Sequence, residues 1–354
     1  MTKDRYVAYV GTYTHGKSEG IYIFDIDTDT WTLKERKVIP VENPSDVLVS
    51  NNGQFLYAVT DRGVNAYQIL EDGDLEFLNS QWTGGMRGCY LETDQEDRFL
   101  FVAGYHDARV SVMPLGEDGY LGEVADGVFH EGIGLNITDR SAMPHVTCVK
   151  MTQDDKGLFA VDSGLDQVKV YDVDGKTGKL RLRDIIRCEL DSGPRMLRMY
   201  RQGEYIYILG GMSNRICVYH AVPDSVQSGA VDYECIQKIS TVSEGKDLRA
   251  AASGIEFSPD GRYLFVSNAG VNTIAVFSVD LKTGLLEQIC SGYCGGDYPK
   301  SLTVLPDNEH FVVLSHNTNE MMAYRMNYEE GYFLMSSKPV SIGQPNSIFI
   351  HKIS

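Results

Sequence analysis

The sequence predicts an all-β fold, a seven-bladed β-propeller built from four-stranded antiparallel blades. Three observations predict it: a two-strand unit recurs seven times, most units continue into one kind of hairpin turn, and the chain ends with a spare strand. About 50 residues and four short strands per repeat are typical of a propeller blade. We expect residues 1–354 to form a single propeller domain.

The recurring unit consists of a polar turn, an apolar strand, a short loop and a second strand of alternating polarity. The segments "NNGQFLYAVTDRGVNAYQI" and "PDGRYLFVSNAGVNTIAVFSV" show it clearly. A residue at the centre of the first strand marks each unit, and successive markers lie 44 to 58 residues apart. The seven markers are Tyr9, Tyr57, Phe101, Phe159, Tyr207, Phe265 and Val312.

A hairpin turn follows the second strand in most units, as in "LEDGDLEF", "GEDGYLGE", "DGKTGKLR" and "LKTGLLEQ". Glycine after a short polar residue suits tight turns that need a positive φ, and a further strand follows each turn. The first unit lacks its innermost strand, while the chain ends with "PNSIFIHKI". Pairing of the N- and C-terminal strands therefore closes the ring and removes an exposed sheet edge.

Composition and charge exclude several classes of partner. The formal charge of −17 argues against binding to nucleic acid or to an anionic membrane, since both require basic surfaces. No segment approaches the length of about 20 apolar residues that a membrane-spanning helix requires. Seven mostly scattered cysteines and a start, "MTKDRYVAYV", without an apolar signal segment favour a reduced, cytoplasmic protein, either monomer or dimer.

The propeller geometry brings two sets of side chains to the mouth of the central channel, because each innermost strand starts on the face where the second strand ends. The strand-start ring comprises Ser45, Tyr90, His145, Arg195, Ser253, Lys300 and Asn346. The second ring comprises Tyr13, Asp61, Tyr105, Ser163, Gly211, Ala269 and His316, with His106 and Asp162 beside it. A concave mouth lined by polar groups is the expected site in such a fold.

The two rings combine basic and aromatic side chains in an acidic protein. Arg195 and Lys300 beside His145 and His316 indicate a small anionic ligand, such as a sugar acid or a phosphate ester. No cofactor is required by this set. The alternative is a zinc or manganese ion held by His106, His145 and His316, because three imidazoles from separate blades are able to bind such a metal.

The phrases "YVGTYT", "FSPDGRYLFVSNAGVNTIAVFSVD", "DSGLDQVKVYDVD" and "SGPR" resemble the propeller lactonases, which include the seven-bladed bacterial 6-phosphogluconolactonases and the fungal carboxymuconate lactonizing enzymes. The resemblance runs through all seven units. It implies a cytoplasmic, metal-independent enzyme that acts on anionic lactones through His, Arg and Glu side chains at the channel mouth.

The chain departs from the family pattern at several site positions. "PHVT" keeps His145 but has Thr147 where the family has a second histidine, and "GPRM" keeps Arg195 but has Met196 in place of histidine. Gly210 and Gly211 stand where the family has an Asn-Glu pair. Ala269 stands where it has an arginine, and Tyr90 where it has a histidine. The aspartate of the family's "DLG" loop is kept as Asp162.

Three functions follow from these residues. The first is lactone hydrolysis, with His145 as base, His316 as a second candidate base, Arg195 as carbonyl polariser and Tyr105 as donor. Substrate contacts would come from Lys300, Tyr90, His106, Asp162, Tyr13 and Asn346.

The second is a lyase or isomerase that moves a proton beside a carbonyl of a sugar acid or keto-sugar, with or without a metal. The third is a non-catalytic propeller that binds a sugar acid or another partner, favoured by the small residues Gly210, Gly211 and Ala269.

Overall fold

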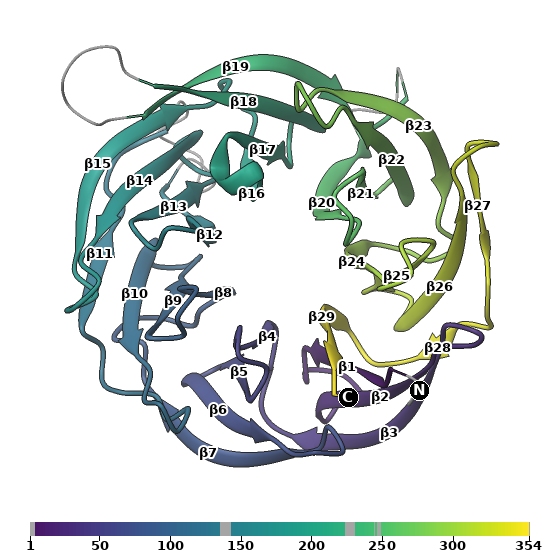
Figure 1. Ribbon diagram of the computed structural model, residues 1–354, viewed down its shortest axis with the longest axis horizontal. Coiled ribbons are helices and arrows are strands. Elements are labelled where there is room, and N and C mark those ends of the chain that lie inside the picture. Colours follow the sequence, from purple (N-terminus) through teal and green to yellow (C-terminus); the bar gives the residue numbers. More distant parts are fainter. Residues whose placement is uncertain (1–3, 135–142, 224–230, 244, 246–248, 354) are drawn as a thin grey trace.

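The computed structural model describes residues 4–134, 143–223, 231–243, 245 and 249–353. These residues form seven antiparallel sheets that stand around a central axis, and Figure 1 shows the sheets as the blades of a closed ring. The predicted all-β, seven-bladed architecture is confirmed. Within the described ranges, no helix has both the length and the apolar character needed to cross a membrane.

Each blade is a meander whose four strands run from the channel to the rim. The innermost strands are β29 (Pro345–Lys352), β4 (Val47–Val49), β8 (Tyr90–Thr93), β12 (Val146–Met151), β16 (Pro194–Tyr200), β20 (Ala251–Phe257) and β24 (Pro299–Val304). The second strands are β1 (Tyr6–Thr12), β5 (Phe55–Thr60), β9 (Phe99–Ala103), β13 (Gly157–Asp162), β17 (Tyr205–Gly210), β21 (Tyr263–Ala269) and β25 (His310–Ser315).

The outer half of each blade completes the meander. The third strands are β2 (Gly20–Asp27), β6 (Gly63–Ile69), β10 (Arg109–Pro114), β14 (Gln167–Val173), β18 (Arg215–Pro223), β22 (Thr273–Val279) and β26 (Glu320–Asn327). The outermost strands are β3 (Thr32–Pro40), β7 (Leu75–Gln81), β11 (Asp126–Phe129), β15 (Leu180–Arg187), β19 (Val231–Ser240), β23 (Leu286–Tyr293) and β27 (Tyr332–Met335). A short strand, β28 (Val340–Ser341), also pairs with β26, and a 3-10 turn, η2 (Arg201–Gly203), joins β16 to β17.

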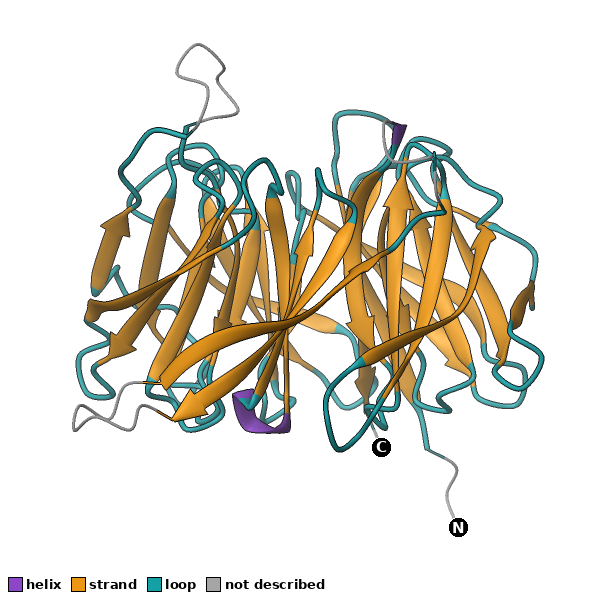
Figure 2. Ribbon diagram, turned by 90° about the horizontal axis from the view of Figure 1, so that it is seen from above, coloured by secondary structure: helices purple, strands orange, loops and turns teal. Residues whose placement is uncertain are grey.

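The ring is closed by the two ends of the chain. β29 pairs antiparallel with β1, so that Tyr6 lies opposite Lys352, and the first blade has the order β29-β1-β2-β3. Figure 2 shows the N and C ends together on one face of the disc, as this pairing requires. The predicted closure by the terminal strands is therefore confirmed, and it leaves β1 without an exposed edge.

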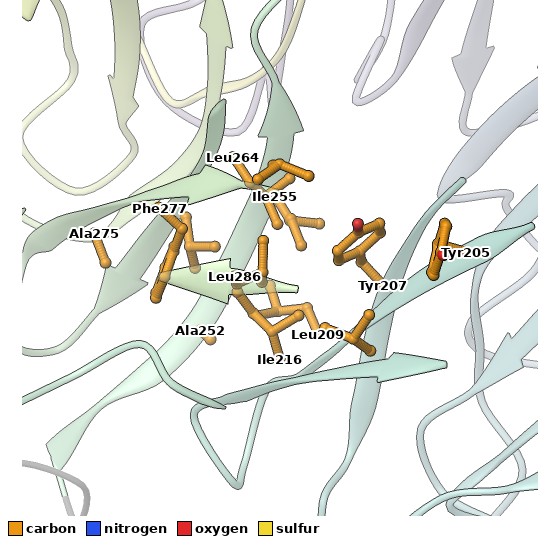
Figure 3. Packing of buried hydrophobic residues seen from close by; sticks show 13 residues of the cluster. Tyr205, Tyr207, Leu209, Ile216, Ala252, Ile255, Leu264, Ala275, Phe277 and Leu286 are labelled. Carbon is orange, nitrogen blue, oxygen red and sulfur yellow. The ribbon is translucent and has the colours of Figure 1, made fainter. Parts of the chain in front are cut away.

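The hydrophobic core is divided into clusters that lie between neighbouring blades. Figure 3 shows one of them, in which Tyr207 and Leu209 of β17 pack against Leu264 of β21 and Phe277 of β22. Strand β17 is buried along its whole length because a neighbouring sheet covers each of its faces. Full burial of one such side chain contributes about 1.5–3 kcal/mol, so each blade depends on both of its neighbours.

The predicted hairpin turns also join neighbouring blades. The Tyr207 hydroxyl donates a hydrogen bond to the Gly284 carbonyl at 2.7 Å, and the Tyr9 hydroxyl donates to the Gly73 carbonyl at 2.9 Å. A Cβ added at Gly284 would lie 2.4 Å from the Tyr205 ring, so a side chain there would be incompatible with the packing. The four turn glycines have the positive φ that the sequence predicts; they are Gly73, Gly119, Gly178 and Gly284.

Five inner strands carry a β-bulge where they start at the channel mouth. The pairing register shifts between Pro194 and Met196 in β16, and between Pro299 and Ser301 in β24. The strands β12, β20 and β29 shift in the same way. In each case one residue has no partner on the second strand, and these residues are Thr147, Arg195, Ser253, Lys300 and Asn346. Bulges redirect side chains next to functional sites, so these five positions are set apart from the regular alternation.

Candidate active site

A cavity of about 1120 Å³ occupies the centre of the ring. All seven inner strands contribute to its wall, and the loops at the strand-start face contribute to its rim. Eight of the ten predicted site residues line it; they are Tyr13, Tyr90, Tyr105, His106, His145, Arg195, Lys300 and Asn346. The other two, Asp162 and His316, lie outside the lining.

His145 is held in one orientation by Tyr105. The imidazole stacks on the phenol ring with centroids 4.2 Å apart and an interplanar angle of 7°. The Nδ1–H of His145 donates to the main-chain carbonyl of Tyr105 at 2.8 Å. With the proton on Nδ1, the neutral ring carries its lone pair on Nε2, which is the arrangement that a general base requires.

Asp162 holds the main chain of this loop and does not face the ligand space. Its side chain is fully buried, and Oδ1 accepts hydrogen bonds from the backbone N–H groups of His145, Gly164 and Leu165 at 3.0 to 3.1 Å. The prediction that Asp162 contacts substrate is wrong, because the carboxylate points into the protein. Its effect on the site passes through the backbone of His145.

The partner of Asp162 is a histidine that sequence reasoning did not select. His130 Nδ1 lies 2.7 Å from Asp162 Oδ2, and both side chains are fully buried. Burial lowers the pKa of His130 despite the neighbouring carboxylate. Burial opposes ionisation of Asp162, but the hydrogen bonds from His130 and the His145 backbone outweigh it and lower its pKa. The pair is therefore a neutral imidazole that donates to a carboxylate.

His316 lies behind the cavity wall. Its ring meets the Tyr13 ring edge-on at 5.7 Å and the Tyr298 ring at 6.2 Å, and its Nδ1–H donates to the Pro345 carbonyl at 3.3 Å. Burial, with a smaller contribution from the charge of Lys300, lowers its pKa. His316 is thus a neutral histidine that supports Tyr13 rather than a side chain directed at the ligand space.

The three histidines of the alternative metal site do not form a ligand set. Among the residues that the structure describes, no three His, Cys, Asp or Glu side chains converge in a way that would hold a metal ion. His106 is exposed at the rim, where its ring meets Tyr105 edge-on at 5.4 Å, and His316 is behind the wall. The predicted zinc or manganese triad is wrong, because its members belong to different layers of the site.

Arg195 and Lys300 face the cavity as two basic side chains that have no carboxylate partner among the described residues. No Asp or Glu in the described part of the chain lies within ion-pair distance of either. The Lys300 ammonium lies 5.7 Å from the centre of the Tyr298 ring. Burial, reinforced by the charge of Arg195, lowers the pKa of Lys300 to about 7. The two side chains make this part of the cavity attractive to an anion.

Several charged groups that line the channel were not predicted from the sequence. Arg198 donates to Glu256 at 2.8 Å and to the Tyr90 hydroxyl at 3.3 Å, so the predicted ligand contact of Tyr90 competes with a bond to the protein. Lys150 pairs with Glu92 at 2.7 Å. For Arg198 the bulge at Arg195 is the reason: it shifts the alternation of β16, so that the channel-facing side chains of this strand no longer follow a period of two.

The cavity also contains a carboxylate that no motif indicated. Asp46 lines the wall, and its Oδ2 accepts the backbone N–H of Leu91 at 2.8 Å. Burial raises the pKa of Asp46 to about 7. At the rim, Arg87 lies 4.7 Å over the Tyr13 ring. Asp46 follows the predicted ring residue Ser45 directly, so its position was available in the sequence although its orientation was not.

Comparison with known proteins shows the family of this chain. Residues 7–350 match the family described as "Lactonase, 7-bladed beta-propeller". The 6-phosphogluconolactonase of Bacillus subtilis is 30% identical, over the full length of both chains. That of Formosa agariphila is 26% identical over 91% of this chain and 93% of its own.

Solved structures share the fold. A protein from Lactobacillus plantarum superposes with a TM-score of 0.86 and 28% identity, covering 98% of this chain and 99% of its own. The periplasmic gluconolactonase of Pseudomonas aeruginosa gives 0.89 at 24% identity, covering 99% and 100%. Since the family match spans almost the entire chain, this protein belongs to the seven-bladed β-propeller lactonases.

Proposed function

We propose that this protein hydrolyses a sugar lactone that carries an anionic group, with 6-phosphogluconolactone as the first substrate to test. The observation that carries the proposal is that Arg195 and Lys300, which have no carboxylate partner in the described ranges, share one cavity with the oriented base His145. Relatives that bear the name 6-phosphogluconolactonase support the choice of substrate.

The reaction needs a base, an anion-stabilising group and water. His145 Nε2 takes a proton from water as the oxygen attacks the lactone carbonyl, and Arg195 stabilises the negative charge that develops on the carbonyl oxygen. The proton then passes from His145 to the ring oxygen as the ester C–O bond breaks, which yields the open-chain acid. Lys300 in its protonated form pairs with the anionic group of the substrate.

The carboxylate that the family resemblance leads us to expect at Gly211 has no counterpart there. A Cβ added at Gly211 would lie 3.3 Å from the Ala252 carbonyl, so the backbone is close-packed around a glycine. Asp46 is the carboxyl group in the cavity whose pKa, raised by burial to about 7, suits proton exchange at neutral pH. We therefore assign the base to His145 and treat Asp46 as a second proton carrier.

The cavity volume suits a six-carbon sugar acid with a phosphate group. Ligand sites usually measure about 300–1,000 Å³, and the volume here is about 1120 Å³. The proposed steps use only water and side chains of this chain, and no cofactor takes part. The predictions of a cytoplasmic location and of a monomer or dimer accompany the proposal.

The test is proton release from freshly prepared 6-phosphoglucono-δ-lactone and from unphosphorylated gluconolactone, measured against spontaneous hydrolysis. We expect the wild type to accelerate the phosphorylated lactone, and His145→Ala and Arg195→Ala each to lower kcat/KM by roughly 10² to 10⁴. His220→Ala and Arg181→Ala serve as controls, since both residues lie away from the cavity.

The outcomes separate this function from its rivals. A wild-type rate equal to the spontaneous rate on both lactones would contradict the proposal. If calorimetry then showed gluconate or 6-phosphogluconate bound tightly without turnover, the non-catalytic propeller would be the better description. A lyase or isomerase would instead be detected as exchange of the hydrogen next to a carbonyl in deuterated water.

A further inference from the structure

Two lysines line the cavity, and their surroundings are opposite in charge. Lys150 lies 2.7 Å from a carboxylate oxygen of Glu92, which compensates its positive charge. Lys300 has no Asp or Glu within ion-pair distance in the described ranges, and the charged group that acts on it most strongly is Arg195. The same cavity therefore contains a neutralised lysine and an uncompensated one.

Arg195 and Lys300 place two uncompensated positive charges in one cavity. Together they therefore release a proton more easily than an isolated lysine does. Two cations that share a low-dielectric cavity repel each other, and a guanidinium cannot release its proton in a protein. Lys300 is therefore the group that becomes neutral. Burial and the charge of Arg195 lower its pKa to about 7, so a substantial share of Lys300 is free amine near neutral pH, against about one in 10³ for an ordinary lysine.

The other groups around Lys300 do not restore its charge. Burial raises the pKa of the Cys89 thiol to about 12, so the thiol stays protonated. Burial lowers the pKa of His316, so the imidazole stays neutral. Tyr298 presents its ring to Lys300 at 5.7 Å. Lys300 is thus a desolvated amine beside a fixed cation, an arrangement that activates lysine as a nucleophile.

We propose that Lys300 is an imine-forming lysine that reacts with α-keto acids whose carboxylate binds Arg195. The lysine and the arginine both project from β-bulges at the channel mouth, on β24 and β16, and both line the cavity. A carbonyl carbon adjacent to a carboxylate would then meet an amine and a guanidinium in one site. This activity goes beyond lactone hydrolysis and does not require it.

The chemical step conserves atoms and charge. The lone pair of Nζ attacks the carbonyl carbon, a C–N bond forms, and the oxygen takes up a proton to give a carbinolamine. Loss of one water molecule then leaves a C=N bond between Lys300 and the former carbonyl carbon. The imine, once protonated, withdraws electrons from the adjacent C–H bond, so this site would support proton transfer next to a carbonyl without a metal.

The charge of the ligand decides which chemistry occurs. A phosphorylated lactone brings about two negative charges, which keep Lys300 protonated against the charge of Arg195, so that Lys300 binds the phosphate while Arg195 faces the lactone carbonyl. An α-keto acid brings one carboxylate, which Arg195 neutralises alone, and Lys300 then remains available as an amine. Lys300 therefore serves as an anion-binding cation for one ligand class and as a reactive amine for the other.

The experiment traps the imine. The whole protein is incubated at pH 7 with pyruvate and cyanoborohydride, which reduces imines but not ketones, and the modified lysines are then identified by peptide mass spectrometry. We expect modification of Lys300 to exceed that of Lys150, which is paired with Glu92, by roughly 10² to 10³-fold, since only about one in 10³ of an ordinary lysine is free amine at pH 7. Arg195→Met is expected to reduce the labelling at residue 300, since it removes both the carboxylate partner and the repelling charge.

Three results would overturn the proposal: equal labelling of Lys150 and Lys300, no labelling at all, or labelling of Lys300 that Arg195→Met leaves unchanged. Lys300→Arg keeps the positive charge and must abolish the label at that position, and circular dichroism verifies its fold. The ratio of the two lysines within the wild type decides the question even if a variant fails to fold. Lactone hydrolysis has no part in this readout, so the two proposals fail or succeed separately.

Discussion

His145 lies flat on Tyr105 and also donates a hydrogen bond to the main chain of the same residue. The ring centroids are 4.2 Å apart, the planes differ by 7°, and the Nδ1 to carbonyl distance is 2.8 Å. Tyr105 therefore fixes both the plane and the tautomer of the proposed base. The position of Tyr105 in the sequence predicts a donor to substrate, and the geometry offers a second role as a platform for His145.

Substitution of Tyr105 separates these two roles. Tyr105→Ala removes the stack but keeps the carbonyl, and we expect kcat/KM for lactone hydrolysis to fall roughly tenfold, since stacked aromatic pairs contribute about 0.5–1.5 kcal/mol. Tyr105→Phe keeps the stack and should stay within about twofold of the wild type. Steady-state kinetics on both variants check this. A loss in Tyr105→Phe as large as that in Tyr105→Ala would assign the hydroxyl to the substrate.

Asp162 should influence catalysis only by holding the backbone of His145 in position. Asp162→Ala leaves the backbone N–H of His145 without its acceptor, and we expect kcat to fall about tenfold or more with little change in KM. Asp162→Asn should recover most of the loss, because the amide oxygen still accepts that N–H. His130 would then accept from the amide and carry its proton on Nε2, which has no partner in the described structure. Failure of Asn to rescue would indicate that the negative charge itself is needed.

Asp46 should make stability depend on pH in an unusual direction. Its pKa is about 7 in the folded protein because of burial, against about 3.9 in the unfolded chain. Between pH 4 and 7 the folded state holds a proton that the unfolded state releases, so this carboxyl lowers the free energy of unfolding as pH rises. Asp46→Asn should remove that loss, and its stability relative to wild type should rise by on the order of 2 kcal/mol from pH 4.5 to 7.5.

Urea unfolding at several pH values measures this effect. Asp280→Asn is the matched control. Backbone hydrogen bonds lower the pKa of Asp280 in the folded protein, so its contribution changes only below the ordinary range of an aspartate. Its stability difference from wild type should therefore be constant from pH 4.5 to 7.5, while that of Asp46→Asn changes. Parallel behaviour of the two variants would contradict the assignment to Asp46.

The hydroxyl of Tyr207 should contribute measurably to the joint between two blades. Tyr207→Phe leaves the buried Gly284 carbonyl without its 2.7 Å partner, and we expect the free energy of unfolding to fall by about 1–2 kcal/mol. Phenylalanine fits the position, since Phe101, Phe159 and Phe265 occupy it in other blades. Tyr57→Phe should cost less because its bond to the Gly119 carbonyl is longer, at 3.3 Å. Chemical denaturation compares the two, and a larger loss for Tyr57 would contradict the ranking.

The fold was predictable because its signals are local and repeated. The markers from Tyr9 to Val312 all lie on second strands, and the turn glycines such as Gly73 and Gly284 adopt the positive φ that their turns require. Seven repetitions of one pattern leave few other architectures to consider. The same periodicity placed Arg195 and Lys300 at the channel mouth.

The details of the site were less predictable because they depend on contacts between distant segments. Asp162 and His130 are 32 residues apart, and no spacing rule links them. The position of Asp162 in a familiar loop suggested a ligand contact, whereas four hydrogen bonds turn its carboxylate inward. Arg198 was missed because a bulge of a single residue reverses the side-chain alternation of β16.

The pairing of β29 with β1 also determines when the site is complete during synthesis of the chain. β29 carries Asn346 and is made after the other six inner strands. Until it leaves the ribosome, β1 presents an open edge and the channel lacks one part of its wall. A chain in which β29 has not yet been made therefore has an incomplete cavity and an open edge able to associate with other strands, and the binding site is completed only when β29 pairs with β1.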